Sequence, residues 1–401
     1  MARVARVEAF APDEIATVHV MNRVVRRCFL MGTDDLTGKN YDHRKIWVEN
    51  ELKRLAAGFG IDLLSMAILS NHFHLILRSR PDVVATWDDT EVARRWLLLC
   101  PVRKSADGSA AEPSEPELNS IRFDADKVNT IRSRLSDISW WMRVLCQRIA
   151  QKANFEEEIS GKFLGNRYKA VRLIDDEAIL ACAAYVDLNP IRAGIAQTIE
   201  DSQFTSARLR LQTTVGAVTD SVEGSVGSND VVIGSALHSN NLPNPDSAQT
   251  PVDLGESARR EQTSAPKSMS VFTEFNAALD SFLAPIEIDE LSDPLGARAS
   301  ASNFRCSAKG FLAMPTAAYL ELLDWTARQI VTGKRGATPE DAPLIFERLK
   351  IKPMVWYELV TRFGKLFSLV AGQPHRVDEF RGRLRKQRYH VRQAARELLS
   401  T

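Results

Sequence analysis

Asn71-His72-Phe73-His74-Leu75-Ile76-Leu77 is the stretch of sequence that decides the fold. It puts two imidazoles two residues apart inside an apolar run. Because the side chains of a strand alternate with a period of two, we expect His72 and His74 on one face, with Phe73 and Leu75 on the other. Two nitrogen donors side by side on a rigid strand make half of a metal site. A structural or coincidental pair is the plainer alternative, so a second motif has to decide.

The elements around this stretch predict an α+β fold. Residues 61–69 read as an apolar strand, and Ser70-Asn71 as a tight turn, so the histidine pair begins the second strand of a hairpin. We further expect strands over 17–22 and 170–174 and helices over 43–59, 91–99, 131–154 and 176–188, the last of them capped by Asp175. The order βαββ, then helices, then a strand and a helix predicts a ferredoxin-like antiparallel sheet covered by helices.

Composition divides the chain into three regions. The 401 residues are enough for two domains. Residues 15–205 carry the motifs and form the expected catalytic domain. Residues 212–300 are rich in Ser, Thr, Asn, Asp, Gly and Pro, which predicts a largely disordered linker. Residues 305–401 read as a helical region and a candidate for DNA binding, and residues 103–119 as an exposed loop in the first domain.

Charge and cysteine content exclude several classes of protein. The formal net charge is +1, so any signal for nucleic acid has to be local. The five cysteines are scattered without a CxxC pair, which argues against a zinc ribbon or a disulfide framework and fits a reducing compartment. The first residues contain no apolar signal region, and no run of about 18 apolar residues occurs. We therefore expect a cytoplasmic protein with no membrane partner.

The second motif is Ala184-Tyr185-Val186-Asp187-Leu188-Asn189-Pro190-Ile191-Arg192-Ala193-Gly194. Tyr185 and Asn189 are four residues apart, so they are expected to share one face of the last helical turn. Alone they read as a packed tyrosine and a C-terminal asparagine. Beside a histidine pair they fit phosphodiester transesterification, which needs a nucleophile and a Lewis acid on the phosphate. A mixed nitrogen and oxygen ligand set suits Mg²⁺ or Mn²⁺, although paired histidines also accept zinc, cobalt or nickel.

Together the two motifs resemble those of the single-tyrosine HUH transposases, and in particular the branch of REP-associated tyrosine transposases. His19-Val20-Met21-Asn22-Arg23 is similar to the family's first strand, and Gly165-Asn166-Arg167-Tyr168-Lys169-Ala170 to its basic segment before the catalytic helix. The resemblance covers residues 15–205. It implies the HUH nuclease fold and a transposase that cleaves and rejoins single-stranded DNA, with a hairpin as the expected structure of that DNA.

The resemblance also implies the roles of particular residues. His72, His74 and Asn189 would hold a divalent ion, Mg²⁺ or Mn²⁺. Tyr185 would be the nucleophile, forming a 5′-phosphotyrosine link and releasing a 3′-OH. Tyr168 is an alternative nucleophile, but it precedes the strand and has no Asn or His four residues on. Some single-tyrosine HUH enzymes complete each active site with a helix from a partner subunit, while members of the branch that this sequence resembles can act as monomers. The resemblance therefore leaves open whether this protein is a monomer or a homodimer.

Further residues are candidates for DNA contacts because phosphates are held mostly by Arg and Lys. Near the motifs these are Arg23, Arg167 and Lys169. In the C-terminal basic run, whose other reading is a solvated helix face, they are Arg383, Arg385 and Lys386. Trp140 and Trp141 either stack on bases or pack in the core, and His19 either borders the site or is structural.

Two other functions remain open at this point. One is a metal-dependent phosphodiesterase that uses water in place of Tyr185. The other is a DNA-binding regulator without catalysis, against which the presence of both histidines, the tyrosine and the asparagine argues.

Overall fold

The computed structural model describes residues 10–11, 13–25, 29–106, 108–165, 167–223, 282–288, 296–332, 346–347, 350–384 and 389–400. Its strands are β1 (Thr17–Arg23), β2 (Ile61–Ile68), β3 (His72–Ser79), β4 (Lys169–Leu173) and β5 (Val370–Ala371). Its helices are α2 (His43–Gly58), α3 (Pro81–Ala85), α4 (Asp89–Leu99), α5 (Glu115–Arg122), α6 (Ala125–Leu135), α7 (Ile138–Glu156), α8 (Asp176–Asp187), α9 (Asn189–Arg192), α10 (Ser206–Glu223), α12 (Thr316–Thr332), α14 (Pro353–Leu366), α15 (Pro374–Leu384) and α16 (Gln393–Leu399).

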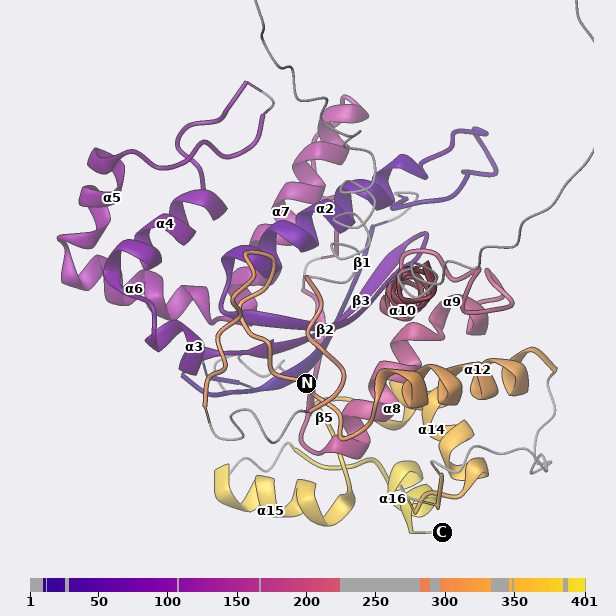
Figure 1. Ribbon diagram of the computed structural model, residues 1–401. Coiled ribbons are helices and arrows are strands. Elements are labelled where there is room, and N and C mark those ends of the chain that lie inside the picture. Colours follow the sequence, from indigo (N-terminus) through magenta and orange to yellow (C-terminus); the bar gives the residue numbers. More distant parts are fainter. Residues whose placement is uncertain are drawn as a thin grey trace, which may run out of the picture.

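The protein is a mixed α+β structure built on a five-stranded sheet in the order β2-β3-β1-β4-β5 (Figure 1). The pairs β2–β3, β3–β1 and β1–β4 are antiparallel, and β4–β5 is parallel. The first four strands and α2 and α8 lie close to the predicted ranges. The fifth strand was not predicted, because two residues are too few to leave a periodic signal in sequence.

The predicted β2–β3 hairpin is confirmed. Its turn closes with the amide of Leu69 donating to the carbonyl of His72 at 2.9 Å. A bulge in β2 between Leu63 and Ser65 leaves Leu64 without a partner in β3. The carbonyl of Leu64 accepts a hydrogen bond from Arg210 of α10 at 2.8 Å instead, so α10 is attached to the sheet at the bulge.

Each face of the sheet is covered by its own layer (Figure 1). Helices α2 and α7 cover one face, while α8, with α10, α12 and α14, covers the other. Along β1 and β3 the alternation is regular, because Val18, Val20, Phe73 and Leu75 enter the core on the α2/α7 side. Ile76 enters the core on the α8 side. The intervening residues of both strands therefore face α8.

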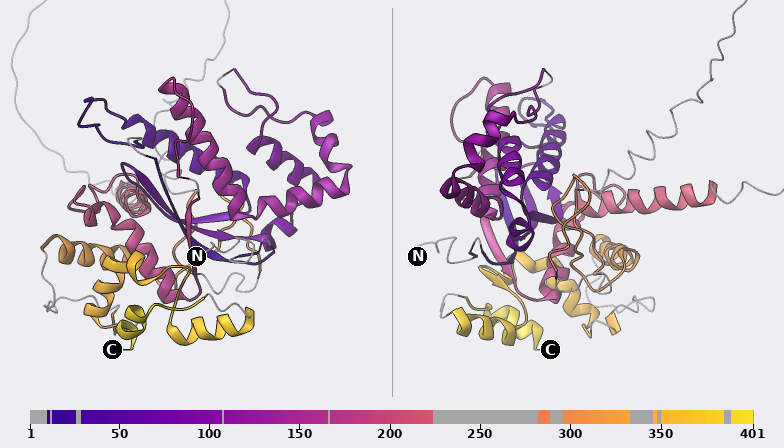
Figure 2. Two further views of the ribbon diagram at one scale, coloured as in Figure 1. Left: turned by 180° about the vertical axis from the view of Figure 1, so that it is seen from behind. Right: turned by 60° about the vertical axis from the view of Figure 1, so that its left-hand side comes forward.

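The C-terminal region packs on the same sheet and helices as the N-terminal half (Figure 2). Helix α14 lies against α8, β5 pairs with β4, and residues from both halves of the chain form one buried core. The domain limits 15–205 and 305–401 remain predictions. The linker over 212–300 also remains a prediction, but parts of its range are ordered, because α10 continues to Glu223 and residues 282–288 pack against β2. Residues 224–281 lie outside the described part of the chain.

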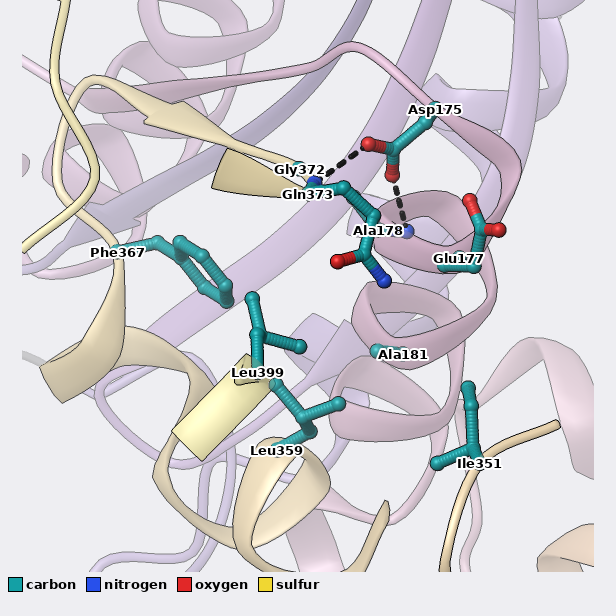
Figure 3. A pocket seen from close by; sticks show the side chains of 10 residues that line it. All are labelled: Asp175, Glu177, Ala178, Ala181, Ile351, Leu359, Phe367, Gly372, Gln373 and Leu399. Atoms are coloured by element: carbon teal, nitrogen blue, oxygen red, sulfur yellow. Dashed lines mark hydrogen bonds between the residues drawn. The ribbon is translucent and has the colours of Figure 1, made fainter. Parts of the chain in front are cut away.

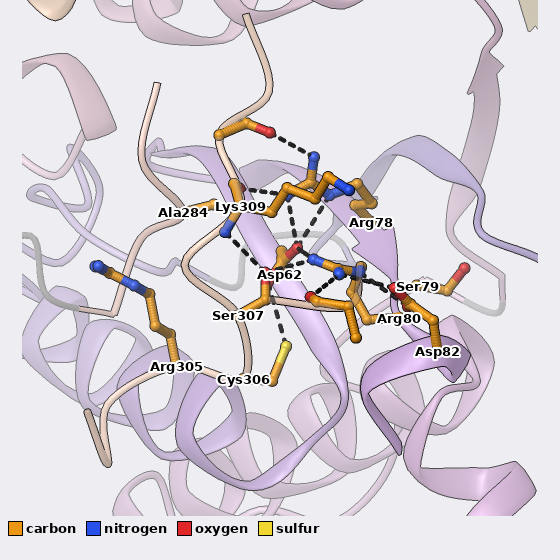
Figure 4. A network of polar contacts seen from close by, with 12 residues as sticks. Asp62, Arg78, Ser79, Arg80, Asp82, Ala284, Arg305, Cys306, Ser307 and Lys309 are labelled. Atoms are coloured by element: carbon orange, nitrogen blue, oxygen red, sulfur yellow. Dashed lines mark hydrogen bonds and ion pairs between the residues drawn. The ribbon is translucent and has the colours of Figure 1, made fainter. Parts of the chain in front are cut away.

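A buried charge network joins residues 296–312 to the hairpin (Figure 4). Asp62 of β2 is 1% exposed and accepts hydrogen bonds from Arg78 at 2.8 Å and Arg80 at 3.1 Å. Its other oxygen accepts from the hydroxyl of Ser307 at 2.7 Å. Arg78 also donates to the carbonyl of Gly310 at 2.9 Å, so every charge in the network has several partners.

Among the described helices, none combines the length and the apolar content that crossing a membrane would require.

Candidate active site

Three histidines gather on the α8 face of the sheet. His74 lies opposite Met21 in the β1–β3 register, and His72 lies opposite Arg23. His19 precedes Met21 by two residues on β1, so strand alternation places it on the same face. His19 and His74 are buried, and His72 is half-buried. The expectation that His72 and His74 share a face agrees with this arrangement, and His19 joins them.

Hydrogen bonds engage the Nδ1 atom of both His72 and His74. Nε2 of His19 lies 2.9 Å from Nδ1 of His74, with the ring planes at 8°. Nδ1 of His72 lies 2.7 Å from Oδ1 of Asn71, an oxygen that can only accept, so this nitrogen carries the proton. In the tautomer of His74 that carries its proton on Nδ1, as His72 does, this nitrogen donates to Nε2 of His19. Both strand-β3 histidines then present an unprotonated Nε2, the arrangement that orients metal-binding imidazoles.

Burial keeps these imidazoles neutral at physiological pH. It lowers the pKa of His19 to about 4. Burial, helped by the charge of Arg23, lowers the pKa of His72 to about 4. The pKa of His74 lies well below its usual value, first because of burial and then because of His19 and His72. A neutral imidazole keeps the lone pair that a metal ion needs.

Tyr185 of α8 lies over the same cluster. Its ring centroid is 5.5 Å from that of His74 and 5.9 Å from that of His19, both edge to face. The side chain is half-buried, and its hydroxyl makes no hydrogen bond to any described residue. The structure therefore brings together three of the predicted site residues, His72, His74 and Tyr185, and within the described part of the chain the Tyr185 hydroxyl has no hydrogen-bond partner.

Sequence reasoning missed the residues that cover Tyr185. Phe363 of α14 lies 5.5 Å from it, centroid to centroid. A Cβ built on Gly364 would lie 3.1 Å from the Tyr185 hydroxyl oxygen, so only glycine fits here without displacing the phenol. The Arg192 guanidinium lies 4.5 Å from the ring centroid and donates to the carbonyl of Thr361 at 2.6 Å. No local sequence signal could have found α14 at this site, since it is far along the chain.

The expectation that Tyr185 and Asn189 share one helical turn was wrong. Helix α8 ends at Asp187, and Asn189 opens the separate short helix α9, with Pro190 in its first turn. Proline is favoured at the start of a helix because it lacks the amide hydrogen that would be unpaired there. Asn189 is buried, and within the described residues it makes no hydrogen bond to His72 or His74.

Asp187 anchors the end of α8 that carries Tyr185. Its buried carboxylate accepts from the hydroxyl of Ser206, from the amide of Ala207 at 3.0 Å and from Tyr319 at 2.7 Å. Burial raises the pKa of Asp187, while Arg210 and these hydrogen bonds oppose the rise. Because Tyr319 belongs to α12, the C-terminal region helps to position this end of α8.

The nitrogen atoms of His72 and His74 could supply two of the ligands of the divalent ion that the resemblance implies. His72 and His74 each have one free nitrogen on the same face. Among the residues that the structure describes, no three His, Cys, Asp or Glu side chains are arranged to hold a metal ion together, and this includes the three histidines of the cluster. A third ligand would have to be another kind of residue, and Asn189 or a group on the substrate fits that role.

The basic residues predicted near the motifs lie at one end of the sheet. Arg23 ends β1, opposite His72, and its carbonyl accepts from the amide of Gly165 at 2.8 Å. Lys169 pairs with Met21 in the β1–β4 register, so it shares the histidine face. Arg23 and Lys169 are exposed, and Arg167 is half-buried.

Of the three predicted C-terminal basic residues, the structure describes only Arg383, which is not brought to this cluster. Arg383 lies on α15 and pairs with Glu379 at 3.5 Å. The ring centroid of Phe380, on the same helix, lies 4.6 Å from the guanidinium carbon of Arg172, which is near the end of β4 opposite to Lys169. Arg385 and Lys386 lie outside the described residues.

Tyr168 lies on the opposite face of the sheet from the three histidines. Its ring is buried in the core between the sheet and α7, and its hydroxyl lies 3.5 Å from that of Ser139. The sheet separates it from His72 and His74, so geometry favours Tyr185 as the candidate nucleophile.

A small pocket lies at the other end of α8 (Figure 3). Its walls are mostly apolar and come from α8, α14 and the segment after β5. The half-buried carboxylate of Asp175 accepts from the amides of Ala178 at 2.9 Å and Gln373 at 2.6 Å. The first bond caps α8, as predicted, and the second ties the start of α8 to the C-terminal region.

Comparisons with known proteins add one distant likeness. No model of a protein family matches the chain, and no curated protein matches it. A solved structure of a REP-associated tyrosine transposase bound to a REP hairpin aligns with a TM-score of 0.30 and 11% identity, over 59% of this chain and 96% of that one. A likeness of this size is too small to identify the chain, and the chemistry of the site has to be argued from its own residues.

Proposed function

We propose that the protein is a single-tyrosine HUH transposase, a metal-dependent transesterase for single-stranded DNA with a ferredoxin-like catalytic core. In the proposed reaction Tyr185 Oη attacks a DNA phosphorus, the bond from phosphorus to O3′ breaks, and a 5′-phosphotyrosine link and a free 3′-OH remain. The phenolic proton is given up to water and the departing oxygen takes one up. Reversal with another 3′-OH rejoins the strand without an external energy source.

The observation that carries the proposal is the meeting of Tyr185 with the histidine face. The phenol lies 5.5 Å from His74, centroid to centroid, and its hydroxyl has no partner among the described residues. The sheet order β2-β3-β1-β4 supports the ferredoxin-like core. A hydroxyl with no competing hydrogen bond, beside neutral imidazole nitrogens that can hold a metal ion, suits attack on a phosphate that the ion polarises.

Mg²⁺ or Mn²⁺ is the proposed cofactor, with His72, His74 and Asn189 as its ligands. When bound, the ion would polarise the phosphate. Residues of the chain would position the DNA strand and the nucleophile. Arg23 and Lys169 flank the face of the sheet on which the DNA strand would lie, and Arg192 holds the phenol ring of Tyr185. Arg167, Arg383, Arg385 and Lys386 are further proposed DNA contacts. Hairpin DNA as partner, a monomeric or homodimeric state and a cytoplasmic location remain predictions.

The test is covalent capture. Labelled single-stranded hairpin DNA is incubated with Mn²⁺ and either the wild type or Tyr185→Phe, and the products are separated in SDS. We expect an SDS-resistant adduct with the wild type and with Tyr168→Phe, and none with Tyr185→Phe. An adduct that survives in Tyr185→Phe would refute the assignment.

A phosphodiesterase that uses water is the second candidate. The half-burial of Tyr185 under Phe363 and Gly364 favours it, since a covered phenol is harder for a strand to reach. Cleavage without any adduct in the same assay would select this function. Binding without cleavage would select the DNA-binding regulator.

A further inference from the structure

A cluster of arginines and tryptophans lies on the far side of the sheet from Tyr185. Arg134 of α6 and Arg143 of α7 both stack on Trp140, with their guanidinium carbons 4.5 Å and 4.8 Å from its ring centroid. Trp96 of α4 meets Trp140 edge to face at 5.6 Å. The neighbouring Trp141 packs in the core with Phe59. The sequence left open whether Trp140 and Trp141 stack on bases or pack in the core; in the structure Trp141 is a core residue, and Trp140 belongs to the arginine cluster.

Two more arginines extend the cluster around the end of α4. Arg54 of α2 donates to the carbonyl of Leu99 at 3.0 Å, and Arg148 of α7 donates to the same carbonyl at 2.9 Å. All four guanidiniums act on the thiol of Cys100, lowering its pKa against the larger effect of burial, which raises it. We call Arg54, Arg134, Arg143, Arg148, Trp96 and Trp140 the arginine–tryptophan patch.

The patch carries an excess of positive charge. Glu51 pairs with Arg54 at 2.5 Å and lies 3.5 Å from Arg148. Neither Arg134 nor Arg143 makes an ion pair with any residue that the structure describes. Burial lowers the pKa of Arg148, and the positive charge of the nearby Arg54 lowers it further, while Glu51 opposes both effects. An anion bound here would offset the excess of positive charge.

We propose that the arginine–tryptophan patch binds the phosphate backbone of duplex DNA. Stacking on Trp140 holds two guanidiniums in place and leaves their N–H edges free for phosphate oxygens. The indole is occupied by these guanidiniums and by Trp96, so it offers little ring surface to an unpaired base. Single-stranded DNA is bound largely through such stacking, whereas a duplex presents phosphates alone. This surface rests on the proposed function and deepens it: while Tyr185 acts on one face, the patch holds a paired stem on the other.

The test is binding of a labelled blunt duplex, without a hairpin loop, to the full chain carrying Tyr185→Phe so that no covalent product forms. Arg134→Gln combined with Arg143→Gln should weaken binding about tenfold or more. It should also reduce the slope of log K against log salt by about 1.8, at about 0.9 for each phosphate that the variant no longer neutralises. Arg143→Lys keeps the charge and should keep the slope.

The matched control is Arg328→Gln combined with Arg362→Gln, which removes the same charge from exposed arginines paired with Asp324 and Glu358. This control should bind like the parent protein. Equal weakening in both double variants would reduce the patch to a net-charge effect and overturn the proposal. So would unchanged binding in the patch variant, a loss confined to single-stranded DNA, or stronger competition by an acidic peptide than by duplex.

The outcome is separable from that of the proposed function. Adduct formation is measured on proteins whose patch is intact, and duplex binding is measured in the Tyr185→Phe background, where no adduct forms. Duplex binding that depends on the patch, with no adduct in the other assay, would refute the proposed transesterase and support the patch as a duplex-binding surface. An adduct together with duplex binding that does not depend on the patch would support the transesterase and overturn the proposal for the patch.

Discussion

Two buried polar clusters lie at opposite ends of strand β3, and they differ in how completely they are satisfied. At the end of β3 and just beyond it, Arg78 and Arg80 close on Asp62, and hydroxyl and carbonyl groups of residues 296–312 take up the remaining bonds. At its start, His72 and His74 each keep a free nitrogen, and the Tyr185 hydroxyl has no partner among the described residues. A saturated cluster holds two parts of a chain together, while an unsaturated one keeps bonding capacity for a ligand.

The difference also lies in charge. The Asp62 cluster is ionised and paired, so removing one member leaves buried charge behind. The histidine cluster is neutral, because burial lowers the pKa of each imidazole. Substitution should therefore affect folding in the first cluster and ligand binding in the second.

The largest effect is expected from Asp62→Ala. Removing the carboxylate leaves Arg78 and Arg80 buried without their shared partner, which should lower the free energy of unfolding by about 3–5 kcal/mol in urea titrations. Asp82→Ala is the control, because Asp82 pairs with the same Arg80 at 2.8 Å but its side chain is 28% exposed. It should cost at most about 1 kcal/mol. Equal losses in the two variants would show that the Asp62 network does not fasten residues 296–312.

The next effect concerns the histidine cluster. Mn²⁺ at about a hundred times its dissociation constant should raise the free energy of unfolding by about 2.7 kcal/mol, because it binds only the folded site. His72→Ala should remove this gain. His43→Ala, which changes an exposed histidine paired with Glu156, should keep it. Full stabilisation of His72→Ala by Mn²⁺ would place the ion elsewhere.

A smaller effect is expected at the cover over Tyr185. In Gly364→Ala the new Cβ would stand 3.1 Å from the phenolic oxygen, so Tyr185 has to shift by a few tenths of an ångström. We expect adduct formation to slow roughly tenfold, as small misplacements of reacting groups do. Gly382→Ala on α15, where a Cβ meets nothing within 4 Å, should leave the rate unchanged. Equal rates in both variants would mean that α14 does not position the phenol.

The smallest effect is the acid dependence of the saturated cluster. Burial alone would raise the pKa of Asp62, but Arg78 and Arg80 outweigh it and lower the pKa from its usual 3.8. Between the folded and unfolded values the unfolded chain binds more protons, so stability is present above pH 3.8 and is lost as the pH falls further. Urea titrations from pH 5 downward should show a flatter curve for Asp62→Asn. A curve parallel to that of the wild type would contradict the pairing.

Local pattern predicted the elements that depend on near neighbours. The period of two in residues 72–77 indicated both the strand and the face of the histidines. Asp175 was predicted to cap the helix that follows it, and its side chain does so by accepting a hydrogen bond from the amide of Ala178. Other local signals were misread. The predicted helix over 131–154 is two helices, because Asp137 caps a new one. The predicted loop over 103–119 contains the start of α5, marked by the capping box of Ser114 and Glu117.

The rest of the site depends on contacts between distant parts of the chain. Phe363 and Gly364 reach Tyr185 only because α14 packs on α8, and nothing in their own neighbourhood indicates that. Arg192 stood in the quoted motif, but its place over the ring follows from the turn into α9. His19 was ambiguous because its partner, His74, lies 55 residues away.

The parallel pairing of β5 with β4 has a consequence for synthesis. The two strands are separated by roughly 200 residues, so at about 5–20 residues per second β4 waits on the order of ten to forty seconds for its neighbour. Helix α14 directly precedes β5 and emerges equally late. During that interval α8 can pack on β2, β3 and β4, but its contacts with α14, including the one between Tyr185 and Phe363, cannot yet form. The cover over the candidate nucleophile is therefore added long after the strands and the helix that carry the site.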